Sequence, residues 1–149
     1  MRIALFEPEI AGNVGAILRL SACFGAAVDL IEPMGFEWDD RVRRTAMDYI
    51  DHVIIARHAS FDAFRTTIGC QRLVLFTTKC RQSAYDFSYM ADDILLFGKE
   101  SAGVPTAVFE ACDARVRIPM RSQVRSMNLA TSAALALGEA LRQSSTLPS

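Results

Sequence analysis

Short apolar runs alternate with amphipathic stretches along the whole chain. Each run is four to six residues long, and those at 72–77 and 94–97 are nearly continuous in apolar residues, which is typical of strands covered on both faces of a sheet. Between the runs, apolar residues recur at helical spacing. The predicted strands cover residues 2–6, 28–31, 53–56, 72–77, 94–97 and 115–118. This alternation predicts an α/β fold with a mainly parallel sheet flanked by helices.

Local signals place the ends of the predicted helices. Gly25 is suited to stop a helix, Ser60 to cap one, and Pro105 to occupy a first turn. We expect a single domain over residues 1–143, followed by a flexible C-terminal tail over 144–149. The predicted helices cover residues 16–24, 41–47, 61–66, 105–111 and 128–142.

Composition narrows the class of protein. The chain has 149 residues, of which 51% are apolar, so it has enough apolar side chains for one core and is not disordered as a whole. It contains no apolar run long enough to span a membrane and no recognisable signal peptide. The four cysteines form no C-x-x-C pair. We therefore expect a cytoplasmic protein with reduced cysteines and no metal site.

The charged residues nearly cancel, with 16 basic and 17 acidic side chains. This balance argues against nucleic-acid binding by overall charge, although a local basic face remains possible. The basic residues are 14 arginines and 2 lysines, and arginines gather at 41–44 and 115–125. The excess of arginine over lysine has two possible explanations. One is a composition bias of the genome, and the other is contact with phosphate groups, which the guanidinium of arginine binds with two hydrogen bonds.

Three polar loops follow predicted strands, at 9–15, 97–105 and 118–129. Ligands of parallel α/β sheets bind beyond the carboxyl ends of the strands. The first loop contains Gly12 and Gly15 but matches neither a dinucleotide-binding fingerprint nor a P-loop. The third ends at Asn128, before the longest predicted helix, whose free amides favour a polar ligand. The ordinary alternative is that Ser126 or Asn128 only caps that helix.

Taken together, the three loops resemble the sequence motifs of SPOUT-class RNA 2′-O-methyltransferases. Residues 31–40, with the sequence IEPMGFEWDD, resemble the TrmL (YibK) group in particular. The resemblance covers essentially the whole chain. The matching motifs are Asn13-x-Gly15-x-x-x-Arg19, Phe97-Gly-x-Glu100-x-x-Gly103-x-Pro105 and Ile118-Pro-Met-x(5)-Ser126-Met-Asn128-Leu129.

This resemblance implies an activity and a fold. The group methylates the ribose 2′-oxygen of the wobble nucleotide, position 34, in certain leucine tRNAs, where the base is a cytidine or a modified uridine. The methyl donor is S-adenosylmethionine, which becomes S-adenosylhomocysteine, and no metal takes part. The C-terminal part of the fold forms a deep trefoil knot, and the protein is a homodimer.

The resemblance also implies roles for single residues. Arg19 is expected to bind a tRNA phosphate or to polarise the ribose hydroxyl, because the high pKa of free arginine makes it a poor base. The residues expected to orient the reacting groups are Asn13, Glu100, Ser126 and Asn128. The cofactor-binding residues are Phe76, Gly98, Ile118, Ser126, Met127 and Leu129. The RNA-binding candidates are Arg41, Arg44, Arg121 and Arg125, and tRNA affinity should fall steeply with added salt.

Two positions depart from the group's pattern. Lys99 stands where some relatives have a proline, and Ala102 where some have an arginine. Apart from these departures, two alternative functions stay open: a SPOUT methyltransferase that acts on another tRNA or rRNA ribose, and a non-catalytic module that binds RNA or an adenosine ligand.

Overall fold

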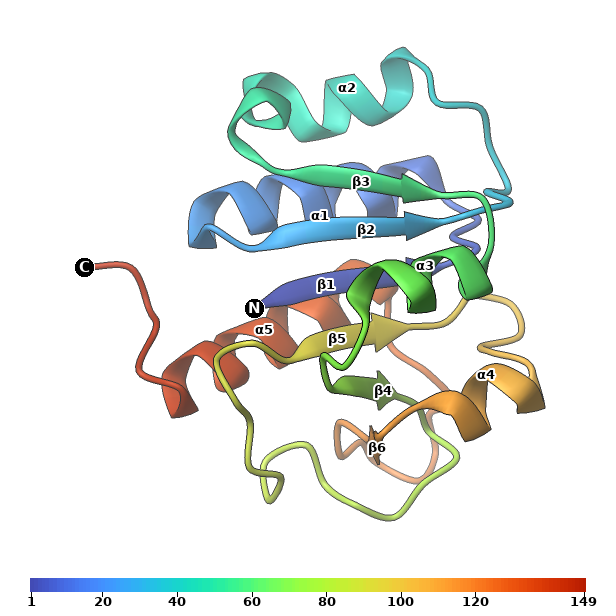
Figure 1. Cartoon of the computed structure of the whole chain (residues 1–149), viewed down its shortest axis with the longest axis vertical. Helices are drawn as coiled ribbons and strands as arrows, with labels where there is room; N and C mark the ends of the chain where they lie inside the picture. Colours follow the sequence, from blue (N-terminus) through green and yellow to red (C-terminus); the bar gives the residue numbers. More distant parts are fainter.

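A single sheet of six parallel strands runs through the described part of the chain, in the order β3-β2-β1-β5-β4-β6 (Figure 1). The computed structural model describes residues 1–149, apart from the side chains of residues 40 and 41. The strands are β1 (Arg2–Phe6), β2 (Ala27–Ile31), β3 (Ile55–His58), β4 (Leu73–Phe76), β5 (Ile94–Phe97) and β6 (Ala114–Val116). The helices are α1 (Ala11–Phe24), α2 (Asp40–Ala46), the 3₁₀ helix η1 (Met47–His52), α3 (Phe61–Ile68), α4 (Thr106–Ala111) and α5 (Leu129–Gln143).

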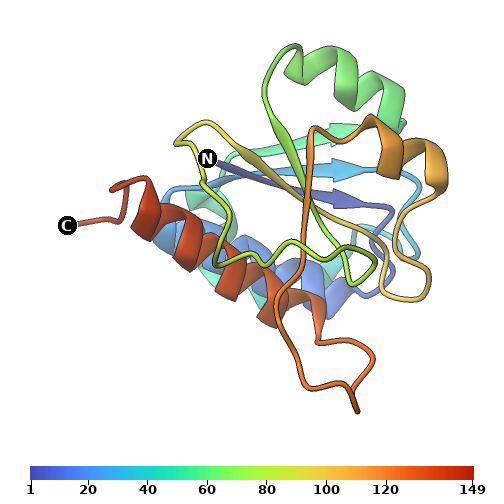
Figure 2. The same cartoon turned by 90° about the horizontal axis from the view of Figure 1, so that it is seen from below.

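Helices cover both faces of the sheet, which makes the strands apolar on both sides (Figure 2). On one face α1, α2 and α5 pack on alternate side chains of the strands, such as Ile3 and Leu5 of β1. On the other face α3 and α4 pack on the side chains between these, such as Ala4 and Phe6. The α/β class and the parallel sheet predicted from the sequence are confirmed. The trefoil knot stays a prediction, as does flexibility of the tail after α5.

The largest difference from the predicted elements is the start of α1. This helix begins at Ala11 instead of residue 16, so both glycines of the first polar loop, Gly12 and Gly15, lie inside it. Gly15 is needed for packing, because a Cβ there would lie 2.5 Å from the Cβ of Thr45 and 2.9 Å from the carbonyl oxygen of Val42. The close approach of α2 to α1 thus explains a glycine that looked like part of a turn.

Four strands also differ from their predicted bounds. β2 begins one residue earlier than predicted, at Ala27, and β4 is shorter than predicted, at Leu73–Phe76. The strand predicted at 53–56 lies at Ile55–His58, and the one predicted at 115–118 is Ala114–Val116. No helix in the described residues has the length and apolar character that a membrane span requires.

The strand order indicates where a ligand site lies on the sheet. The connections run outward from β1 through β2 to β3, whereas β5 and β4 lie on its other side. Loops after β1 and β5 therefore diverge at the carboxyl edge of the sheet, toward which all strands point in Figure 1. Such a switch in winding direction opens a crevice where α/β proteins bind ligands.

Candidate active site

A cavity of about 760 Å³ lies at this carboxyl edge. Four segments line it: the start of α1, the loop after β4, the loop after β5, and the loop from β6 into α5. The three motif loops therefore meet in space although they are far apart in the sequence. The volume lies within the range of about 300–1,000 Å³ that is usual for small-molecule sites.

A chain of side-chain hydrogen bonds joins the three motifs. Asn13, which is 8% exposed, donates from Nδ2 to Glu100 Oε1 at 3.0 Å. Asn128 donates from Nδ2 to Asn13 Oδ1 at 2.9 Å, while its own Oδ1 accepts from two amides in the first turn of α5. The other oxygen of Glu100 accepts from the backbone amide of Glu9 at 2.9 Å. These predicted site residues are brought together, and their polar atoms hold the loops in place.

The loop after β5 folds back on itself at one wall of the cavity. Lys99 and Gly103 exchange two backbone hydrogen bonds, of 3.1 and 2.8 Å. Gly103 has φ of +70°, a conformation that favours glycine. A Cβ on Gly98 would lie only 2.5 Å from the carbonyl carbon of Gly103. Both glycines of this motif are therefore required by the backbone of the loop.

Two further contacts tie this loop to the segment after β1. Lys99 Nζ lies 2.6 Å from Glu7 Oε2, and this carboxylate raises the pKa of Lys99. Ser101 donates to the Glu9 carboxylate from its amide at 2.8 Å and from its hydroxyl at 2.7 Å. These two bonds lower the pKa of Glu9. Lys99, which stands where some relatives have a proline, thus restrains the loop through an ion pair.

Part of the lining of the cavity is apolar. Phe76 stacks on Phe97 with ring centroids 4.9 Å apart, and behind it Tyr89 lies parallel at 6.4 Å. The predicted cofactor-binding residues all line the cavity: Phe76, Gly98, Ile118, Ser126, Met127 and Leu129. Their role in cofactor binding stays a prediction.

Arg19 lies apart from this cavity. It is six residues after Asn13, about 9 Å farther along α1, on the exposed side of the helix. Its Nη1 contacts Met47 Sδ at 3.3 Å, and its guanidinium lies 5.2 Å from the centre of the Tyr49 ring. One copy of the chain therefore does not bring Arg19 together with the other predicted catalytic residues.

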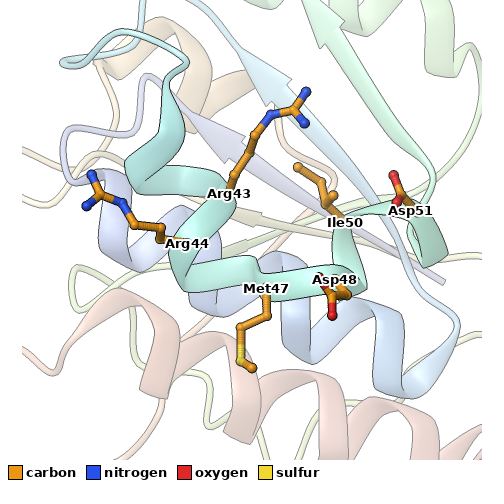
Figure 3. Close-up of a pocket in the computed structure, with 6 residues that line it drawn as sticks. All are labelled: Arg43, Arg44, Met47, Asp48, Ile50 and Asp51. Carbon is orange, nitrogen blue, oxygen red and sulfur yellow. The ribbon is translucent and has the colours of Figure 1, made fainter.

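The RNA-binding candidates are divided in the same way. Arg125 lines the cavity, whereas Arg121 lies on the same loop outside it. Arg44 lines a second hollow of about 600 Å³ over α2 and η1, where the guanidiniums of Arg43 and Arg44 point in different directions (Figure 3). The side chain of Arg41 lies outside the described residues.

Residues 72–79 also resemble the TrmL group, but sequence reasoning gave no site role to those that follow β4. Thr77, Thr78 and Lys79 line the cavity. They follow a strand that the sequence does predict, so the rule that ligands bind at carboxyl ends was sufficient to find them. Glu7 and Glu9 were also missed, because their partners lie 92 residues away.

Known proteins resemble the chain over nearly its full length. The model of the SpoU rRNA Methylase family matches residues 1–138. A tRNA (cytidine(34)-2′-O)-methyltransferase from Beijerinckia indica subsp. indica is 53% identical over 145 residues, which cover 95% of this chain and 90% of the relative.

Two solved structures have a similar fold. One, from work on 2-OH methylation of C/U34 on tRNA, is 36% identical, with a TM-score of 0.91 and coverage of 95% of this chain and 94% of that one. Another is the SpoU methyltransferase AviRb from Streptomyces viridochromogenes in complex with AdoMet. It is 26% identical with a TM-score of 0.85, covering 99% of this chain and 59% of that one.

Proposed function

Because the chain belongs to the SpoU rRNA methylase family, we propose that it methylates the ribose 2′-oxygen of nucleotide 34 in tRNA, with S-adenosylmethionine as the donor. The observation that carries the proposal is the identity of 53%, over nearly the full length of both chains, with a relative named for this reaction. The expected substrates are leucine tRNAs with a cytidine or a modified uridine at position 34. Such an enzyme works where tRNA is found, in the cytoplasm.

The cavity fits an adenosine-containing donor. Its apolar wall of Phe76, Ile118 and Leu129 suits an adenine ring, and the folded-back loop at Gly98 offers backbone groups to the polar edges of a ligand. When bound, S-adenosylmethionine supplies a methyl group on a positively charged sulfur. A solved relative at 26% identity holds this molecule.

The polar residues of the cavity have two different proposed roles, which are to position the loops and to contact the ribose hydroxyl. Asn13, Glu100 and Asn128 bond to one another and keep the loops in one geometry, which favours alignment of the reacting groups. Ser126 lines the cavity, and its hydroxyl has no hydrogen-bond partner among the described residues. We therefore assign Ser126 to the ribose hydroxyl, as a hydrogen-bond partner while that hydroxyl loses its proton.

Arg19 needs a second copy of the chain to reach a cavity. Helices α1 and α5 lie side by side on one face of the sheet (Figure 2), and Leu135 of α5 is 40% exposed there. A homodimer that pairs this region is our proposed assembly, with Arg19 of each copy serving the cavity of the other.

Mixed dimers test this arrangement. Arg19→Ala should abolish methylation and leave donor affinity unchanged, and Ser126→Ala should reduce methylation strongly. When the two variants are co-expressed, each mixed dimer contains one cavity with both residues, so activity should return. If the mixture stays as inactive as the separate variants, Arg19 does not act across a dimer.

The reaction itself is tested with total tRNA. The protein is incubated with labelled S-adenosylmethionine and total tRNA, and the modified nucleotide is mapped. We expect a 2′-O-methyl group at position 34 of leucine tRNAs. Label at another nucleotide or in rRNA would identify a different substrate, and no label in any RNA would contradict a methyltransferase.

A further inference from the structure

Most of the basic side chains that the structure describes already have partners within the fold. Six form ion pairs with carboxylates, Arg115 donates to the carbonyl oxygen of Phe109, and Arg19 contacts Met47 and Tyr49. The ion pairs are Arg2–Asp29, Arg57–Glu32, Arg65–Asp113, Arg72–Asp93, Lys99–Glu7 and Arg142–Glu139. These side chains already make contacts within the fold, and the six in ion pairs are partly neutralised.

The basic side chains without such partners gather in two loops. Among the described side chains, those with no ion pair and no hydrogen bond are Arg43 on α2 and a group of five: Lys79, Arg81, Arg117, Arg121 and Arg125. All five are exposed, and they lie in the loop after β4 or the loop after β6. Charges that do not serve the fold are the ones available to a partner.

The backbone joins these two loops into one surface. The amide of Arg117 donates to the carbonyl oxygen of Gln82 at 2.9 Å, and the amide of Ala84 donates to that of Arg117 at 2.8 Å. Lys79 from one loop and Arg125 from the other line the same cavity. Figure 2 shows the loop after β6 crossing the loop after β4 and then extending away from the sheet.

The composition of this surface suits RNA. Residues 77–86 and 117–125 contain five basic side chains and one acidic side chain, Asp86, although the whole chain has a net charge of −1. Tyr85, next to the basic residues, is 47% exposed. A positive surface with an exposed aromatic ring is typical of sites that bind phosphates and stack unpaired bases.

We infer that the surface formed by loops 77–86 and 117–125 binds the phosphate groups of the substrate RNA and directs the target nucleotide into the adjoining cavity. This inference rests on the proposed function. It adds Lys79, Arg81 and Arg117 to the RNA-contacting residues and gives Tyr85 a role in stacking a neighbouring base. The near-neutral chain thus concentrates its free positive charge beside the reaction site.

The test is the double variant Arg81→Ala/Arg117→Ala, because neither residue lines the cavity. We expect the KM for tRNA to rise about tenfold or more, with kcat and donor affinity unchanged. Each lost phosphate contact should also reduce the slope of log affinity against log salt concentration by about 0.7–0.9. The matched control, Arg65→Ala/Arg142→Ala, removes the same charge from paired residues elsewhere and should change neither the KM nor the slope.

Direct binding to labelled tRNA separates this inference from the proposed function. The wild type could methylate no RNA while the double variant still binds tRNA more weakly than the control variant. That outcome would contradict the proposed activity and support the assignment of this surface to RNA binding. If the wild type methylates tRNA and the two double variants bind equally well, the surface is not a phosphate-binding site.

Discussion

The two sides of the cavity use charge in opposite ways. On one side, in residues 7–10 and 98–105, every charged side chain has a partner in the fold: Glu7, Glu9, Lys99 and Glu100. On the other side, in residues 77–83 and 117–128, none of the basic side chains that the structure describes has an ion pair or a hydrogen bond. They are Lys79, Arg81, Arg117, Arg121 and Arg125.

This difference separates two tasks. A wall whose polar atoms bond to one another has its shape before any ligand arrives, which suits the precise placement of a small donor. A surface with free positive charge gains its partners only when RNA binds, and it attracts RNA from a distance. Changes on the first side should therefore alter donor affinity and turnover, and changes on the second should alter tRNA binding.

The largest loss on the restrained side is expected from Gly98→Ala. The new Cβ would lie 2.5 Å from the backbone of Gly103, so the loop must move. Overpacking of this kind costs about 1–3 kcal/mol, which corresponds to a loss of roughly 5- to 150-fold in donor affinity. Calorimetric titration with S-adenosylmethionine measures the effect. Gly138→Ala is the control, because no atom lies within 4 Å of its added Cβ; equal affinities for the two variants would show that the loop tolerates a side chain.

Glu100→Ala should reduce kcat by about tenfold. The change leaves the amide of Glu9 and Nδ2 of Asn13 without their acceptor, and such loss in a half-buried site costs about 1–3 kcal/mol. Glu100→Gln keeps one amide oxygen as an acceptor, so it should lie between the wild type and Glu100→Ala in single-turnover assays. Should the glutamine variant be as slow as the alanine variant, the negative charge itself, rather than loop geometry, is what the reaction needs.

The sequence was sufficient for the parts of the molecule that depend on local pattern. β1 and β5 have the predicted bounds, because strands buried on both faces appear as uninterrupted apolar runs. The start of α1 was predicted wrongly, since the reason for Gly15 lies in α2, about 30 residues away. The three motif loops were located by their position after predicted strands, whereas the roles of their single residues came from the resemblance to a family.

The sequence could not predict which arginines pair within the fold and which remain unpaired. Arg72 pairs with Asp93 and Arg2 with Asp29, at separations of 21 and 27 residues, and no local signal marks either pair. Arg115 belongs by sequence to the basic segment 115–125, yet it donates to the carbonyl oxygen of Phe109. Only the folded chain distinguishes arginines that hold the structure together from those left for a partner.

A smaller effect is expected from Ser101→Ala and should depend on pH. The pKa of Glu9 is lowered by the two Ser101 hydrogen bonds, so this contact is fully present above the ordinary pKa near 4.5 and is lost as the pH falls through the lowered value. At pH 7 we expect donor affinity to fall about two- to tenfold in the variant. The gap between variant and wild type should begin to narrow below pH 4.5 and close once the pH is below the lowered pKa of Glu9, in titrations from pH 7 down to the lowest pH at which the protein stays folded. A gap that stays constant over this range would mean that the Glu9 carboxylate does not hold the loop.

The smallest effect is expected from a change at Tyr89, whose ring stacks on Phe76. Tyr89 is 8% exposed, and its hydroxyl has no hydrogen-bond partner among the described residues; burial raises its pKa. Tyr89→Phe keeps the ring against Phe76 and removes the buried hydroxyl, so the free energy of unfolding should rise by up to about 1 kcal/mol.

For a chain of this length, such a gain raises the thermal midpoint by about 2–4 °C, measurable by circular dichroism. The control Tyr85→Phe, at a ring that is 47% exposed, should leave the midpoint unchanged. Donor affinity should be the same in both variants, because neither ring lines the cavity. A lower midpoint for Tyr89→Phe would mean that the hydroxyl is bonded in solution, and the loop after β4 would then share the restraint found on the other side of the cavity.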